Sequence, residues 1–99
     1  MIQAAFLYVA PKCNPDEQYA YIPGEELSLT VVGVSDYEDA VKTAIQLKEK
    51  GIQAIELCAG FGSIGVAKVR EAVGPEISVG AVRFDYHPAF GFKSGDEMF

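Results

Sequence analysis

The chain has 99 residues, 49% of them hydrophobic, and a net charge of -6. A chain of this length supports one domain with a single core, and this composition favours a folded globule over disorder. The negative charge and the lack of any Lys/Arg cluster exclude a surface that follows nucleic-acid phosphates, and no apolar run is long enough to span a bilayer as a helix.

We therefore expect a soluble, cytoplasmic protein that binds neither nucleic acid nor a membrane. No basic segment precedes the first apolar run, so the N-terminus does not look like a targeting signal. Cys13 lies in a polar segment and Cys58 in an apolar one. Two such cysteines do not make a disulfide framework, and we expect both to be reduced.

The first third of the chain predicts two strands with a short helix between them. Residues 2–10 are rich in aliphatic and aromatic side chains, as in a buried strand. Residues 14–21 begin with a cap residue, a proline and then an acid, which predicts a short helix. Residues 27–34 are β-branched and almost uncharged, which is typical of a strand buried on both faces.

Helices and strands alternate through the rest of the chain. Ser35 and Glu38 have the spacing of a capping box, and apolar residues follow at helical spacing until Gly51 ends the helix. The remaining predicted elements are a strand, a helix and a strand, over residues 54–59, 63–73 and 77–84.

Strands that alternate with helices through short connections predict β-α-β units. We therefore expect one α/β domain, residues 1–99, with a mostly parallel four-stranded sheet formed by residues 1–84. The aromatic tail, residues 85–99, has no clear periodicity. In the simplest strand order both main helices cover one face of the sheet, so the tail or a second subunit has to cover the other.

A Gly-x-Gly-x-x-Gly loop, Gly60 to Gly65, lies between the third predicted strand and the second main helix. In that position Gly60 permits a tight turn, Gly62 lets a phosphate approach, and the helix offers unpaired N–H groups from Ser63 onwards. A dinucleotide domain places this loop after its first strand, which argues against that ligand. A simple anion or phosphate ester remains one interpretation, and glycines that only permit close packing are the other.

Three charged side chains are candidates for the same site. Arg83 ends the fourth strand, where its guanidinium could assist an anion or pair with Asp85 or Glu56. Glu56 interrupts an apolar strand and by alternation points to the uncovered face of the sheet. Its expected neighbours there are Thr30, Val32, Ser78 and Val82. Glu56 and Asp85 are candidate acids or bases, but pairing by a hydroxyl, the tail or a partner also explains Glu56.

The other reactive side chains give weaker signals. Cys58 precedes a helix N-terminus, which favours a reactive thiol, but a small buried residue explains it as well. His87 is the only histidine, and no Cys-x-x-Cys or His-x-x-x-His spacing accompanies it. We therefore expect neither a metal nor a cofactor.

Several segments together match a known pattern, and the most specific is Glu-Leu-Cys-x-Gly-Phe-Gly over residues 56–62. The others are residues 9–11, 29–34, 36–38 and 79–82. On these segments the chain resembles a family of small prokaryotic proteins classed only as a domain of unknown function. The resemblance extends to about Phe84. It implies a small single α/β domain, and it implies no reaction, substrate or catalytic residue.

Two functions remain as hypotheses. In the first, the protein binds a small anionic or phosphorylated ligand at the C-terminal edge of its sheet through Gly60, Gly62, Ser63 and Arg83, and whether it is an enzyme is left open. In the second, it is a homo-oligomeric interaction protein without catalytic activity, and the uncovered face of its sheet packs against a copy of itself.

Overall fold

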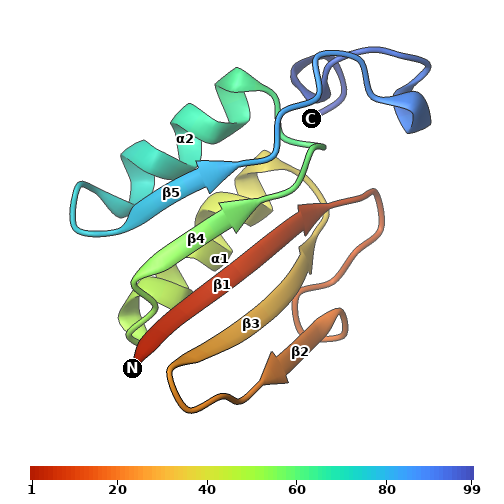
Figure 1. The fold of residues 1–99 in the computed structure, drawn as a ribbon. Coiled ribbons are helices and arrows are strands. Elements are labelled where there is room, and N and C mark those ends of the chain that lie inside the picture. Colours follow the sequence, from red (N-terminus) through yellow and green to blue (C-terminus); the bar gives the residue numbers. More distant parts are fainter.

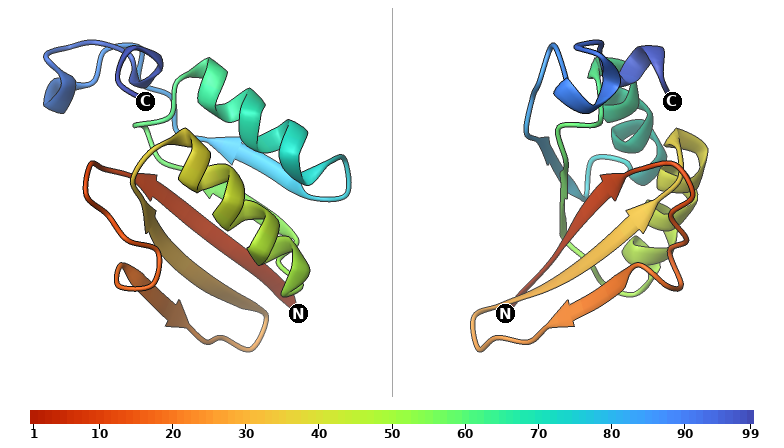
Figure 2. Two further views of the ribbon diagram at one scale, coloured as in Figure 1. Left: turned by 180° about the vertical axis from the view of Figure 1, so that it is seen from behind. Right: turned by 90° about the vertical axis from the view of Figure 1, so that its right-hand side faces the viewer.

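The computed structural model describes all 99 residues as a five-stranded sheet with two helices packed on one face, as Figure 1 and Figure 2 show. The strands are β1 (Ile2–Val9), β2 (Tyr19–Ile22), β3 (Leu27–Val34), β4 (Ala54–Leu57) and β5 (Ser78–Ala81). The helices are α1 (Tyr37–Glu49) and α2 (Ser63–Val73), and the tail holds two 3-10 turns, η1 (Pro88–Phe90) and η2 (Gly95–Glu97).

The strand order is β2-β3-β1-β4-β5, and every neighbouring pair is parallel except β2 with β3. The prediction of a mostly parallel sheet in an α/β fold is therefore confirmed. Both crossovers, β3-α1-β4 and β4-α2-β5, move in the same direction across the sheet. Right-handed crossovers in one direction place their helices on one face, and both helices do lie together behind the sheet in Figure 1.

The number of strands is five instead of the predicted four, because the predicted helix over residues 14–21 is wrong. Its cap signals form only one turn, in which Glu17 and Gln18 donate their N–H groups to the carbonyl of Asn14. The chain then pairs with β3 as the antiparallel strand β2. So short a helix is not stable by itself, whereas pairing with the long edge of β3 satisfies the backbone groups of β2.

Two strands end earlier than predicted. Strand β4 stops at Leu57 and β5 at Ala81, although Cys58 and Val82 still donate one N–H each to the neighbouring strand. The chains diverge at these points, β4 into the glycine loop and β5 into the tail. Both departures lie at the C-terminal edge of the parallel strands.

The N-terminus of α1 is also capped differently from the prediction. Its N-cap is Asp36, whose side chain accepts a hydrogen bond from the N–H of Asp39 at 2.8 Å. The Asp39 carboxylate in turn accepts the N–H of Ser35 at 2.9 Å. The N-cap is therefore Asp36, one residue later than the predicted Ser35, and the carboxylate at the third helical position is Asp39 in place of the predicted Glu38.

The core lies between the sheet and the helices. One side of each central strand faces α1 and α2 across it, and Ala40 and Ala44 let α1 approach the strands closely. The fully buried larger side chains are Leu7, Val32, Val34, Ile55, Leu57, Phe61, Val69 and Val73. No helix of the structure has both the length and the apolar character needed to cross a membrane.

The opposite side of the sheet has no helix over it. The tail does not lie there, because it runs along the C-terminal edge of the strands and its second turn packs on α2, as the edge-on view of Figure 2 shows. The sheet therefore has one covered face and one open face.

We predict that Asp36→Ala lowers the free energy of unfolding by about 1 kcal/mol, because the N–H of Asp39 loses its only side-chain cap. Glu38→Ala is the matched control in the same turn and should cost only a few tenths of a kcal/mol, about the size of a first-turn charge effect. Denaturant unfolding measures both. A larger loss for Glu38→Ala would contradict the observed cap.

Candidate functional site

The glycine loop is held from its N-terminal side by Cys58 and Phe61. The Cys58 sulfur accepts the N–H groups of Gly60 and Val9 at 3.3 and 3.4 Å, and its carbonyl accepts the N–H of Phe61 at 3.0 Å. The Phe61 ring is buried and stacks on Tyr37 with ring centres 5.6 Å apart. The loop is thus tied to β1 and to the first turn of α1 before α2 begins.

The N-terminus of α2 is capped by a carboxylate from the tail. Its own N-cap residue, Gly62, has no side chain to offer. Asp96 supplies the carboxylate, which accepts the N–H of Ile64 at 3.2 Å and the N–H of Gly65 at 3.3 Å. The Tyr37 hydroxyl donates a third hydrogen bond to the same carboxylate at 2.9 Å. The helix end therefore does bind an anion, and the anion belongs to the protein itself.

The glycines around this carboxylate make the space that it occupies. A Cβ on Gly62 would overlap the Asp96 carboxylate, and one on Gly65 would meet the Tyr37 ring. A Cβ on Gly95 would overlap the Gly60 carbonyl. The φ of Gly62 is -80°, which any residue can adopt, so close approach and not backbone conformation requires glycine there.

Tyr37 joins the loop to the tail. Its side chain is only 3% exposed, and its hydroxyl accepts the N–H of Gly62 at 2.9 Å while donating to Asp96. Burial is the main cause that raises the pKa of Tyr37 from 10.0 to about 12. The hydrogen bond from Gly62 acts in the opposite direction, whereas Asp96 raises the pKa further through its hydrogen bond and its charge. Tyr37 is therefore a protonated donor at neutral pH.

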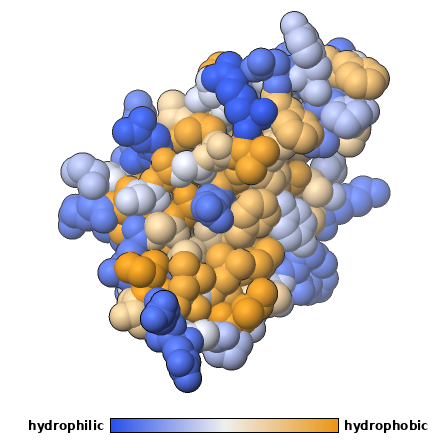
Figure 3. All heavy atoms as spheres, in the orientation of Figure 1, coloured by the Kyte–Doolittle hydropathy of each residue, from blue (hydrophilic) through white to orange (hydrophobic).

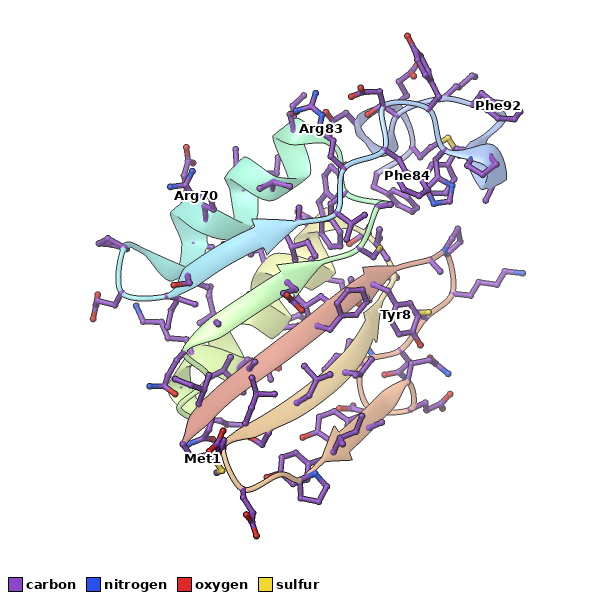
Figure 4. All side chains as sticks on the ribbon, viewed as in Figure 1. Met1, Tyr8, Arg70, Arg83, Phe84 and Phe92 are labelled. Carbon is purple, nitrogen blue, oxygen red and sulfur yellow. The ribbon has the colours of Figure 1, made fainter.

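The predicted anion-site residues are brought together only in part. Gly60, Gly62 and Ser63 lie in one loop, and the exposed Ser63 side chain makes no hydrogen bond. Arg83 does not join them. Its guanidinium pairs with Asp85 at 2.9 Å, and both side chains are exposed beyond the end of β5. Figure 4 shows the Arg83 side chain extending away from the sheet.

Glu56 lies on the open face in the middle of β4, exposed and without a hydrogen bond or ion pair. Strand alternation places Ser78 and Val82 on the same face, as predicted. The prediction of Thr30 and Val32 as neighbours is wrong, because β1 pairs Phe6 with Val31 and so turns those two side chains toward the helices, where they are buried. Neither Glu56 nor Asp85 makes a polar contact with the glycine loop.

One comparison with known proteins found a match, and it covers almost the whole chain. The sequence model of DUF6506, described as a family of unknown function, matches residues 2–97. The chain belongs to this family. Neither the curated proteins nor the solved structures give a match to it. The resemblance to a family of unknown function is thus confirmed, and any activity of this DUF6506 protein has to be inferred from its own geometry.

The two residues that complete the site, Tyr37 and Asp96, were not predicted as site residues. Tyr37 stands in the helical apolar pattern of α1 and carries no separate signal. The tail does contain one local signal, since Ser94 and Glu97 have capping-box spacing and form that box around η2. It predicts the turn, but nothing in it predicts which distant helix the Asp96 carboxylate reaches.

The aromatic residues of the tail pack on one another, and Phe99 also packs on Tyr37, with ring centres 6.0 Å apart. His87 accepts the N–H of Ala89 at its Nδ1 and stacks on Phe90, with ring centres 4.1 Å apart. Phe84 lies against the same imidazole, as its place in Figure 4 indicates. No group of three His, Cys, Asp or Glu side chains is arranged to hold a metal ion.

We predict that Gly62→Ala displaces the Asp96 carboxylate, because the added methyl group takes its place. The free energy of unfolding should fall by about 1–2 kcal/mol through loss of the cap, and residues 94–99 should become more sensitive to proteolysis. Gly80→Ala is the matched control, since a Cβ there meets nothing within 4 Å. Equal stability of the two variants would contradict this account. In an Asp96→Ala background, Gly62→Ala should lower the free energy of unfolding by less than it does in the wild type, and an equal loss in both backgrounds would also contradict it.

We predict that the free energy of unfolding depends on pH in the alkaline range because of Tyr37. The unfolded chain ionises this phenol near pH 10.0, but the folded protein does so only near 12. The stabilisation from protonated Tyr37 is therefore complete below pH 10 and is lost as the pH rises toward 12.

The measurement compares the wild type with Tyr37→Phe, so that the other tyrosines and the lysines cancel. The stability advantage of the wild type over Tyr37→Phe should narrow between pH 10 and 12 and stay constant below that range. Titration of tyrosinate absorbance should show one of the five tyrosines ionising late in the wild type alone. An advantage that stays constant up to pH 12 would count against the buried hydrogen bonds of Tyr37.

Proposed function

We propose that this protein binds a small anionic or phosphorylated ligand at the N-terminus of α2, in competition with its own Asp96. The observation that carries the proposal is the carboxylate held by the amides of Ile64 and Gly65 and by the hydroxyl of Tyr37. These donors and the positive end of the helix dipole do not distinguish a carboxylate of the tail from an external oxyanion.

The position of this helix end in the sheet supports the proposal. The chain leaves β1 toward β2 and β3, whereas it leaves the adjacent β4 toward α2 and β5. Connections that depart in opposite directions from neighbouring parallel strands leave a crevice at their carboxyl ends, which is where ligands bind in open α/β sheets. The glycine loop follows β4 at this edge of the sheet.

The way in which Asp96 is held supports exchange with another anion. Its two contacts with backbone amides are 3.2 and 3.3 Å long, whereas charge-assisted hydrogen bonds are usually about 2.8 Å. Within the tail only Gly95 is buried. Lifting η2 from α2 would expose the donors, and it would break few buried contacts besides that of Phe99 with Tyr37 and the edge of the core.

The ligand class follows from the donors. A phosphate monoester carries more charge than Asp96 and has more acceptor oxygens for the same amides and for the exposed Ser63. No Lys or Arg side chain forms a hydrogen bond or ion pair with Asp96, and the predicted assistant Arg83 is paired with Asp85. We propose binding alone and assign no reaction, because neither Glu56 nor Asp85 touches the donors. Two free cysteines are consistent with the cytoplasmic location that forms part of this proposal.

The test uses inorganic phosphate and a simple phosphate monoester as probes and thermal unfolding as the readout. Asp96→Asn should be less stable than the wild type without ligand, because the helix end loses its charged cap. It should then gain more in melting temperature from each probe than the wild type does, since no internal carboxylate competes.

Asp85→Asn is the matched control, since it removes one tail carboxylate that does not touch α2. Its response to phosphate should equal that of the wild type, and sodium chloride at the same ionic strength should give no gain in any variant. If Asp96→Asn responds to phosphate no more than Asp85→Asn does, the site is only a structural cap and the proposal is wrong.

A further inference from the structure

The open face of the sheet is unusually apolar for a surface that nothing covers. Figure 3 looks directly at it and shows hydrophobic side chains across most of its area. Ile2, Ile22, Leu27 and Val82 are 48, 54, 51 and 53% exposed. Glu56 is the one charged side chain on the strands of this face. A contiguous apolar patch of this kind usually marks an interaction site.

The tail is not the missing cover. Asp96 holds it to the N-terminus of α2, and Gly95 packs directly on the Gly60 carbonyl. Figure 1 and Figure 2 both show the tail beyond the ends of the strands. Phe92, labelled in Figure 4, points away from the sheet at the far end of the tail. Reaching the open face would require breaking these contacts.

The open face is divided into a raised half and a flat half. Strand pairing places one row of side chains across the sheet in the order Ala20, Val31, Phe6, Glu56 and Gly80. The large apolar side chains thus stand on β1, β2 and β3, whereas β4 and β5 present mainly small ones. At Gly80 an added Cβ would meet nothing within 4 Å, so the space above the strand is open there.

We propose that the open face binds a second copy of this chain, face to face, about a two-fold axis that runs along the strands. Such an axis turns the raised half of one copy onto the flat half of the other, and it does so twice by symmetry. The contact would take the form of two sheets stacked about 10 Å apart, as in β-sandwiches.

Charge and area support a second copy as the occupant. The chain carries a net charge of -6, but the acidic residues of α1 and α2 lie on the opposite side of the sheet. Only Glu56 brings a like charge to the contact. Roughly ten apolar or small side chains on each copy offer an area on the order of the ~800 Å² per partner that a standard interface buries.

The test is sedimentation of the full chain over a wide concentration range. The wild type should be a dimer at micromolar concentration, and Gly80→Arg should weaken the dimer about tenfold or more. An arginine at this position has room within its own monomer, because the site is open. Gly80→Ala should keep the dimer. Ile64→Arg is the matched control on the helix side, where Ile64 is 56% exposed, and it should also keep the dimer.

A charge-removal variant provides a result in the opposite direction. Glu56→Gln should tighten the dimer, because one charge less is desolvated on each copy. Thermal unfolding of each variant shows whether its monomer is folded. A wild type that stays monomeric at the highest concentration reached would overturn the proposal. So would a dimer that survives Gly80→Arg, which would point to pairing through the β2 edge instead.

This inference does not rest on the proposed anion site. Asp96→Asn should leave the dissociation constant of the dimer unchanged, because Asp96 lies at the edge of the sheet and not on its face. Gly80→Arg should leave the response to phosphate unchanged. Each proposal can therefore fail while the other stands.

Discussion

The hydrogen bonds around the Asp96 carboxylate determine how three parts of this molecule are arranged. They cap α2, they fix the Tyr37 hydroxyl between loop and tail, and they hold the tail at the carboxyl edge of the sheet. A helix whose N-cap is glycine has unpaired N–H groups and a positive end. Here that requirement is met by a residue far along the chain, and the open face is one consequence.

The glycine loop shows how a geometry typical of phosphate sites is occupied by a carboxylate of the same chain. Gly62 and Gly65 have the spacing of a phosphate-binding loop, and they do bring backbone amides to a negatively charged oxygen. The oxygen belongs to the Asp96 carboxylate, which fills the space beside Gly62, and the Tyr37 ring fills the space beside Gly65. Close packing and anion binding are therefore the same physical arrangement with different occupants.

The two proposed surfaces lie on different parts of the fold. The edge site is formed by loops and the tail, which are the parts of a domain that open most easily. The open face belongs to the strands, whose positions are fixed by pairing on β1. A protein of a family of unknown function thus presents one feature suited to a small ligand and another suited to a copy of itself.

The sequence alone determined the elements whose signals are local. β-branched runs predicted β1 and β3, helical spacing predicted α1 and α2, and alternation of the two predicted the parallel sheet. The tertiary structure decided what depends on distant neighbours. Residues 19–22 became a strand because β3 offered a free edge, and Asp96 became the cap of α2 because the glycines left room for it. Neither outcome is encoded within a few residues, since pairing and capping at long range depend on where the fold places each partner.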